Sequence, residues 1–277
     1  MNCFIKLSIK TSKLNGFKIQ IPYEQTLNDN DLINLLRSGS QIPIQLTFNN
    51  MRTKEQLAAR VAEQIEVDSS SIIQYITDST FLIENNLTYD NVACLFIPNT
   101  YEFYWNTSVE AFVSRMINEY NTFWNNRYNK AQQINLNYLE ISILASIVEK
   151  EQNIRTDERP DIAGLYLNRI KKRMRLESDP TLIYALGDFT INRVLNKDKK
   201  VDSPYNTYIN YGLPPGPICI PSINAIDAVL NASKHDYIFM CAKEDFSGYH
   251  NFSRTYTRHL INAKKYQKAL NKYNIMR

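Results

Sequence analysis

Glycine is scarce in this chain. It supplies 7 of the 277 residues, against about 7% in ordinary soluble proteins. Five of the seven glycines lie after residue 160. Glycine adopts backbone conformations that other residues avoid, so a chain that uses so few of them predicts that each one holds a position closed to other residues.

The chain also lacks long apolar segments. No run approaches the ~18 apolar residues that indicate a membrane span, and Met1–Lys6 has no signal-peptide pattern. Hydrophobic residues make up 44% and charged residues 22%, with a mean hydropathy of -0.39, which excludes a disordered or fibrous chain. A soluble protein with one small and one larger domain is therefore expected from a chain of 277 residues.

Cysteine and histidine are few and widely spaced. The four cysteines form no Cys-x-x-Cys pair, and the three histidines do not share metal-ligand spacing with them. We expect no metal site and no cofactor. The even number of cysteines permits disulfides but does not argue for them. These residues are Cys3, Cys94, Cys219, Cys241, His235, His250 and His259.

Positive charge is concentrated in the second part of the chain. Residues 1–100 carry 8 Lys and Arg against 10 Asp and Glu, whereas residues 101–277 carry 24 against 18. Eleven of these cations lie between residues 155 and 200. They could attract an anionic polymer, but composition alone favours an ordinary solvated helix face. No nucleic-acid partner is expected.

The first hundred residues predict a small β-α-α-β unit. Residues 18–22 read as a short strand and 28–37 as a helix, after which residues 42–48 alternate apolar and polar as a half-buried strand does. A capping box at Thr53–Gln56 starts the next helix, and another short helix begins at Ile72, after Asp68–Ser71. Nothing here supplies a nucleophile, a base or a metal ligand, so an interaction module and a plain structural domain remain equal alternatives.

An aromatic segment, residues 96–105, follows this unit. Aromatic rings can stack on sugars, but such a cluster more often belongs to a core or a domain seam. Pro98 is the predicted hinge between the two halves. A second capping box, Thr107–Glu110, predicts a helix through Trp124.

The segment from Leu136 to Gln152 predicts the helix that carries the chemistry. At about 100° per residue, Glu151 continues the apolar stripe, whereas Glu149 falls beside Ser142 and is expected to face solvent. Burial raises the pKa of a carboxyl group and lets it stay protonated as a general acid. The alternative is that Glu151 turns outward or pairs with Arg169.

Rigid polar loops follow this helix. Residues 177–181 and 202–208 are turn-forming, and residues 212–221 contain two glycines and four prolines. Such loops suit a carbohydrate, which offers many hydroxyls and few charges. Ser222 is expected to begin a helix to Leu230, and residues 256–273 read as a basic surface helix.

Six ordered segments give the chain a family resemblance. They are Leu144–Glu151, Ala163–Arg169, Met174–Thr181, Tyr205–Tyr208, Gly212–Ile218 and His250–Phe252. On these segments the sequence resembles the endolytic murein transglycosylases of the YceG-like family, over nearly the whole chain from about residue 20. His250-Asn-Phe departs from the family's His-Thr-Phe in one side chain.

The resemblance implies an α+β fold in two domains. Residues 1–95 would hold a LysM-like β-α-α-β module at about 41–95, and residues 96–277 the larger α+β catalytic domain. It implies Glu151 as the catalytic acid. The residues it assigns to substrate binding are Asn168, Asp179, Thr181, Tyr205, Asn206, Thr207 and Ser222. The alternatives are a turn or helix cap for Asp179–Thr181 and a loop-bracing pair for Tyr205 and Asn206.

The reaction implied by the resemblance is cleavage of nascent peptidoglycan strands between N-acetylmuramic acid and N-acetylglucosamine. It leaves 1,6-anhydro ends and limits glycan length, with a peptidoglycan synthase as a candidate partner. The family's N-terminal membrane anchor is missing from the printed chain, and the catalytic domain is expected on the periplasmic side of the inner membrane. The cations at residues 171–175 could meet stem-peptide carboxylates or lipid phosphates, or stay solvated.

Two other functions remain open from the sequence. One is a peptidoglycan hydrolase that uses a second carboxylate, with Asp179 as the base and water as the acceptor. The other is a non-catalytic scaffold that binds peptidoglycan.

Overall fold

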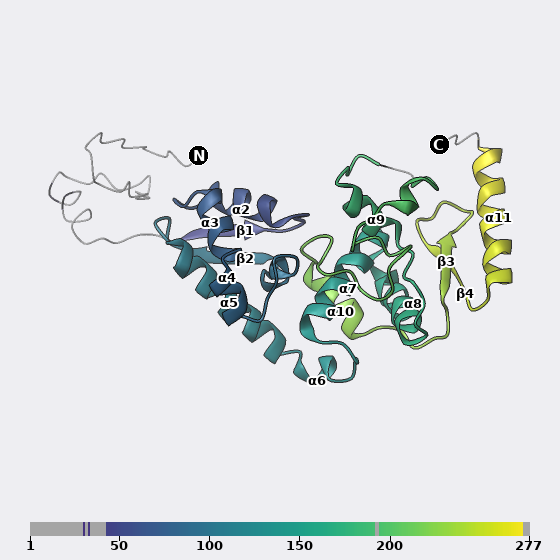
Figure 1. Cartoon of the computed structure of the whole chain (residues 1–277), viewed down its shortest axis with the longest axis horizontal. Helices are drawn as coiled ribbons and strands as arrows, with labels where there is room; N and C mark the ends of the chain where they lie inside the picture. Colours follow the sequence, from purple (N-terminus) through teal and green to yellow (C-terminus); the bar gives the residue numbers. More distant parts are fainter. Residues whose placement is uncertain (1–29, 31–32, 34–42, 192–193, 274–277) are drawn as a thin grey trace.

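The computed structural model describes residues 30, 33, 43–191 and 194–273 and is mixed α+β, as predicted (Figure 1). The predicted strand at 18–22 and most of the predicted helix at 28–37 lie outside the described residues. The elements in chain order are β1 Ile44–Phe48, α2 Lys54–Ala62, α3 Ser69–Ile76, α4 Ser79–Glu84, β2 Asn99–Phe103, α5 Val109–Asn125, α6 Tyr128–Ala131, α7 Tyr138–Glu151, α8 Arg159–Lys171, α9 Asp179–Leu186, α10 Ile223–Leu230, β3 Phe239–Ala242, β4 His250–Ser253 and α11 Tyr256–Lys272.

The first compact unit is built around one antiparallel pair of strands. β1 pairs with β2 in a register that sets Ile44 opposite Phe103 and Phe48 opposite Asn99. Successive side chains of a strand point to opposite faces, so every second residue enters the core. The buried strand residues are Leu46, Phe48, Tyr101 and Phe103.

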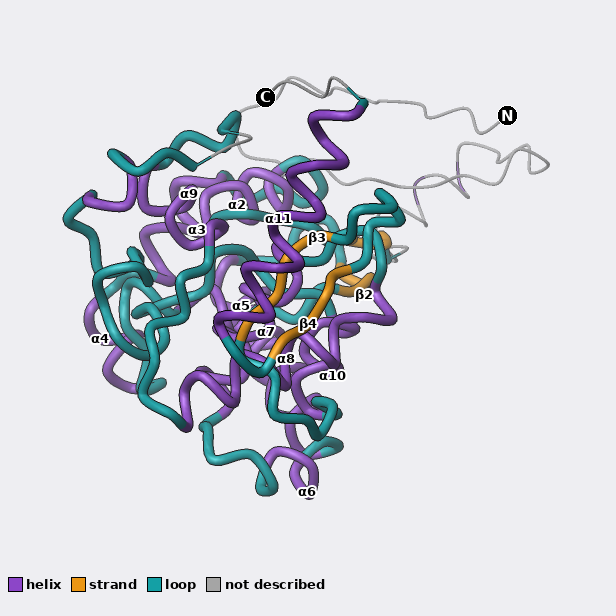
Figure 2. Tube along the Cα trace, turned by 90° about the vertical axis from the view of Figure 1, so that its right-hand side faces the viewer, coloured by secondary structure: helices purple, strands orange, loops and turns teal. Residues whose placement is uncertain are grey.

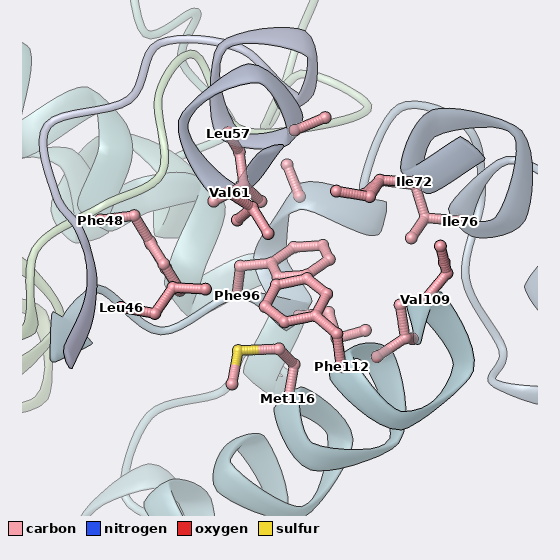
Figure 3. Packing of buried hydrophobic residues seen from close by; sticks show 14 of the residues in the cluster. Leu46, Phe48, Leu57, Val61, Ile72, Ile76, Phe96, Val109, Phe112 and Met116 are labelled. Atoms are coloured by element: carbon pink, nitrogen blue, oxygen red, sulfur yellow. The ribbon is translucent and has the colours of Figure 1, made fainter. Parts of the chain in front are cut away.

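Helices cover the inner face of this strand pair. The Thr53 side chain accepts a hydrogen bond from the Gln56 amide and starts α2, and Asp68 caps α3 in the same way. Their apolar faces meet α5 around Phe112, which is fully buried (Figure 3). The predicted helix start at Thr53 is therefore confirmed, whereas α3 begins at Ser69, three residues before the predicted start at Ile72, because Asp68 already caps it.

The first unit extends beyond the predicted boundary at residue 95/96. β2 lies after that boundary and pairs with β1, and the first half of α5 joins the same hydrophobic cluster (Figure 1). Pro98 lies within the unit, directly before β2. Most of the aromatic segment is core, as favoured from the sequence, because Phe96, Tyr101 and Phe103 are buried.

The second unit is arranged around α7. This helix packs against α8 on one side and α10 on another, and α9 lies near its C-terminal end (Figure 1). β3 and β4 form an antiparallel pair that α11 covers from outside (Figure 2). Ser222 caps α10 through its side chain, which confirms the predicted helix start.

Loop residues 203–221 connect the two units. The Ile220 amide donates to the Met51 carbonyl at 2.9 Å, and the Tyr205 hydroxyl donates to Asp90 at 3.2 Å. A Cβ atom added at Gly216 would lie 2.0 Å from the Asp90 carbonyl oxygen, so only glycine fits there. This position bears out the expectation that the few glycines hold places closed to other residues.

Between residues 43 and 273, as far as they are described, no helix combines the length and apolar character that crossing a bilayer requires.

Candidate active site

Glu151 is the last residue of α7, and two hydroxyl groups hold its carboxyl group. The Tyr166 hydroxyl, from α8, and the Ser178 hydroxyl, at the start of α9, each donate to Oε1 of Glu151 at 2.6 Å. Both of these hydrogen bonds end on the same oxygen. They fix the orientation of the carboxyl group and leave Oε2 as the atom that can carry a proton.

The surroundings raise the pKa of Glu151. Burial is the largest cause, because it disfavours the charged form. The hydrogen bonds from Ser178 and Tyr166 act in the opposite direction, the negative charge of Asp179 raises the pKa, and His250 lowers it. The pKa of Tyr166 is also raised, first by burial and then by Glu151, so its hydroxyl stays protonated and can donate.

Ser178 is itself held by two threonines. Its backbone amide donates to the Thr207 hydroxyl at 3.0 Å, and its carbonyl accepts from the Thr181 hydroxyl at 2.8 Å. The two threonine hydroxyls lie 2.8 Å apart, and both residues are buried. The structure thus places Thr181 and Thr207 directly behind Ser178, where they position the group that contacts Glu151.

A second polar cluster lies beside the end of α7. Glu158 accepts from the His250 backbone amide and lies 2.7 Å from Nδ1 of the same histidine. The Gln152 side chain donates to Glu158 at 2.7 Å and to the Gly248 carbonyl at 2.9 Å. These contacts fasten the residue that follows Glu151 to the start of β4.

Glu149 does not face solvent, so that prediction was wrong. It is 6% exposed, and its carboxylate accepts from the Ser222 amide at 2.7 Å. The helical wheel assumes one solvated face, whereas α7 lies between α8 and α10 and every residue from Ile141 to Glu149 is buried. The alternative pairing of Glu151 with Arg169 does not occur either, because Arg169 binds Glu177.

Asp179 is exposed and lies near Glu151. The Tyr208 hydroxyl donates to its carboxylate, and its charge contributes to the raised pKa of Glu151. Of the predicted substrate-binding residues, Asp179 is the one whose side chain combines exposure with proximity to the carboxyl group. The alternative of a helix cap does not apply to Asp179 itself, because Asp179 is the first residue of α9 and Ser178 holds the cap position.

The other predicted binding residues lie in bracing positions. The buried Asn206 side chain donates to the carbonyls of Lys199 and Val201, while Tyr205 reaches Asp90 of the first unit. Asn168 donates to the His235 and Tyr237 carbonyls and holds the segment before β3. Ser222 caps α10.

Tyr166 and Ser178 were missed as site residues by the sequence analysis. Both lie within the segments that carry the family resemblance, at Ala163–Arg169 and Met174–Thr181. Their hydroxyl groups could have marked them as candidates. The sequence spacing of Tyr166 and Ser178 from Glu151, however, does not show that the fold brings these two hydroxyls to its carboxyl group.

The arrangement provides one half-buried carboxyl group with two fixed donors on one oxygen. Such a group can give a proton to a leaving oxygen and take one back later in the reaction. The hydroxyl donors stabilise the carboxylate that remains after the proton has left. The site therefore has the properties of a single general acid and base.

The chain is similar to proteins of one known family. A profile of the YceG-like family matches residues 19–265. An endolytic murein transglycosylase from Bacillus subtilis is 32% identical over 257 residues, which cover 87% of this chain and 70% of that protein. An endolytic murein transglycosylase from Streptococcus pneumoniae serotype 2 is 32% identical over 205 residues, which cover 72% of this chain and 37% of that protein.

A solved structure has the same fold. The crystal structure of a YceG-like protein from Listeria monocytogenes superposes with a TM-score of 0.66 at 28% identity. The match covers 85% of this chain and 81% of that one.

Proposed function

The chain belongs to the YceG-like family and is an enzyme of the lytic transglycosylase class, and we propose that Glu151 is its single catalytic acid and base. The observation that carries the proposal is the pair of 2.6 Å hydrogen bonds to Oε1 of a carboxyl group whose pKa is raised by burial. The substrate is the glycan strand of peptidoglycan.

In the first step Glu151 gives the proton on Oε2 to the oxygen between N-acetylmuramic acid and N-acetylglucosamine. The bond from that oxygen to C1 of the muramic acid breaks, and positive charge develops on the sugar ring. As Glu151 becomes a carboxylate, Tyr166 and Ser178 stabilise its negative charge through Oε1.

In the second step the Glu151 carboxylate takes the proton from the C6 hydroxyl of the same muramic acid. The C6 oxygen forms a bond to C1 and closes a 1,6-anhydro ring, so no water is consumed. One carboxyl group is sufficient, because the nucleophile belongs to the substrate.

We assign the remaining predicted residues by their placement. The exposed Asp179 and the half-buried Tyr208 form a hydrogen-bonded pair beside Glu151 and would contact the substrate. Thr181 and Thr207 would act through Ser178, and Asn168, Tyr205, Asn206 and Ser222 would hold the walls of the site. In the alternative of a hydrolase, Asp179 would be the base, because it is a second carboxylate close enough to raise the pKa of Glu151.

Finer features of the family remain proposals for this chain. The first unit would serve as a LysM-like module, which the order of a strand, helices and a closing strand supports. Action on nascent strands outside the inner membrane, attachment to that membrane, control of glycan length and contact with a peptidoglycan synthase belong to the same proposal.

The test is to incubate the wild-type protein and Glu151→Gln with uncrosslinked nascent glycan strands and to read the products by mass spectrometry. The wild type is expected to give anhydro ends, and Glu151→Gln to cleave about 10²–10⁴-fold more slowly, the usual effect of losing a general acid. Reducing ends from the wild type would favour the hydrolase, and intact strands from both proteins would favour a scaffold.

A further inference from the structure

An open hollow of about 520 Å³ lies at the C-terminal end of α8. Ile170, Arg173 and Met174 form one wall, and Tyr211 and Gly212 of the rigid loop form the other. The mechanism uses none of these five residues. The walls combine apolar side chains with a cation, which is the surface expected for a ligand that is apolar in part and carries negative charge.

Arg173 holds an unusual backbone position in this hollow. The Arg173 amide donates to the Ile170 carbonyl and the Met174 amide to the Arg169 carbonyl, which is the hydrogen-bond pattern of a Schellman helix end. Arg173 takes the left-handed position of that motif, with φ +52°. Glycine usually fills this position, so an arginine there costs backbone free energy and suggests a use for its side chain.

The chain around Arg173 is rich in positive charge. Lys171, Lys172, Arg173 and Arg175 are all exposed, and the Arg175 guanidinium lies 4.8 Å from the centre of the Tyr211 ring. The nearest acidic side chain along the chain, Glu177, already pairs with Arg169 at 3.2 Å. Arg169 also donates to the carbonyls of Arg175 and Leu176. These hydrogen bonds offset the partial negative charge of the two carbonyl oxygens, so the oxygens repel an anion less.

The hollow begins one helical turn along α8 from the tyrosine that contacts the proposed catalytic acid. Ile170 follows Tyr166 by four residues on α8, so the two side chains share a helix face about 6 Å apart. Tyr166 donates to Glu151, and the opposite wall continues from Tyr208, which donates to Asp179. A group that branches from the reacting sugar toward the C-terminal end of α8 would meet the hollow.

We propose that this hollow is a subsite for the stem peptide of the muramic acid whose bond is cleaved, with Arg173 binding a peptide carboxylate. The inference rests on the proposed function, because it needs the reacting sugar to lie at Glu151. The peptide branches from the C3 side of that sugar, close to the bond that breaks. Its short aliphatic side chains fit Ile170, Met174 and Tyr211, and its carboxylates fit the cations.

The apolar walls favour a peptide over a lipid phosphate. A phosphate head group needs cations alone, whereas Tyr211 is 66% exposed and offers a flat ring at the mouth of the hollow. This ring together with the cations Arg173 and Arg175 suits a ligand that has both apolar side chains and carboxylates.

Arg173→Gly is the informative variant. Glycine suits the left-handed position, so the helix end is expected to fold at least as well, while the guanidinium is removed. The measured quantity is kcat/KM on strands that carry stem peptides divided by kcat/KM on the same strands stripped by an amidase. The wild type is expected to prefer peptide-bearing strands, and Arg173→Gly to lower the ratio about tenfold, as loss of one charge-assisted hydrogen bond does.

The matched control is Lys268→Ala, which removes an exposed cation from α11 and is expected to keep the wild-type ratio. A wild-type ratio near one, or an unchanged ratio in Arg173→Gly, would overturn the subsite and leave the proposed function intact. Loss of binding to anionic lipid vesicles in Arg173→Gly with an unchanged ratio would likewise overturn it.

A binding measurement distinguishes failure of the subsite proposal from failure of the proposed catalytic function. A soluble muramyl peptide is titrated calorimetrically into Glu151→Gln and into Glu151→Gln with Arg173→Gly. Weaker binding to the double variant supports the subsite even if the wild type cleaves neither kind of strand, a result that would contradict the proposed function alone. Equal binding to both proteins would overturn the subsite.

Discussion

The two compact units of this molecule bury different kinds of side chain. Within residues 43–116 the buried side chains are apolar or aromatic, whereas the described residues from 117 to 262 also bury acids, arginines, amides and hydroxyls. A buried polar group is costly unless it is hydrogen-bonded, and Glu149, Glu158 and Arg169 all have partners. The difference indicates that apolar packing holds the first unit together, whereas the second unit also depends on buried hydrogen bonds.

Apolar burial alone should determine the stability of the first unit, and Phe112→Ala tests this most strongly. Phe112 is fully buried, with ring centroids 5.5 Å from Phe103 and 6.2 Å from Phe96. We expect its truncation to lower the free energy of unfolding by about 3–5 kcal/mol, measured by denaturant titration. Phe189→Ala, at a ring that is 40% exposed, is the control and should cost far less. Equal losses would contradict the comparison.

Loss of a polar contact in the second unit should change activity rather than stability. Tyr166→Phe keeps the ring but removes a hydrogen bond to Glu151, and we expect kcat to fall about 10–100-fold because the carboxyl group loses a fixed donor. This bond lowers the pKa of Glu151, so its removal should also move the basic limb of the pH–rate profile to higher pH. A fall in kcat with an unmoved basic limb would indicate a merely structural role.

The raised pKa of Glu151 should be visible in stability, as the smallest of these effects. A carboxyl group whose folded pKa exceeds its unfolded value of about 4.3 destabilises the fold as pH rises through the two values. Glu151→Gln has no charge to bury, so its melting temperature should exceed that of the wild type by a margin that grows from acid to neutral pH. A margin that shrinks over this range would mean that the fold stabilises the carboxylate.

Local signals could be predicted well from the sequence. Thr53 and Ser222 were placed at helix starts, and Thr107 was placed one residue from the actual cap Ser108, because a capping side chain needs only its own next three residues. The same short-range periodicity put Glu151 on the apolar stripe of its helix.

Tertiary features could not be predicted from the sequence. Glu149 was misplaced because a wheel does not show that α10 covers the second face of α7. The extent of the first unit depends on β2 pairing with a strand 51 residues or more earlier in the chain. Tyr166 and Ser178 reach Glu151 only after three helices have packed.

The central claim is that the reaction uses one carboxyl group, and Asp179→Asn tests it most directly. The products of this variant on uncrosslinked glycan strands are compared by mass spectrometry and by rate with those of Glu151→Gln. We predict that Asp179→Asn still releases anhydro ends, with the basic limb of its pH–rate profile moved to lower pH, since the charge that raises the pKa of Glu151 is gone. A loss of cleavage as complete as that of Glu151→Gln, from a wild type that gives reducing ends, would contradict the account and assign the reaction to two carboxylates.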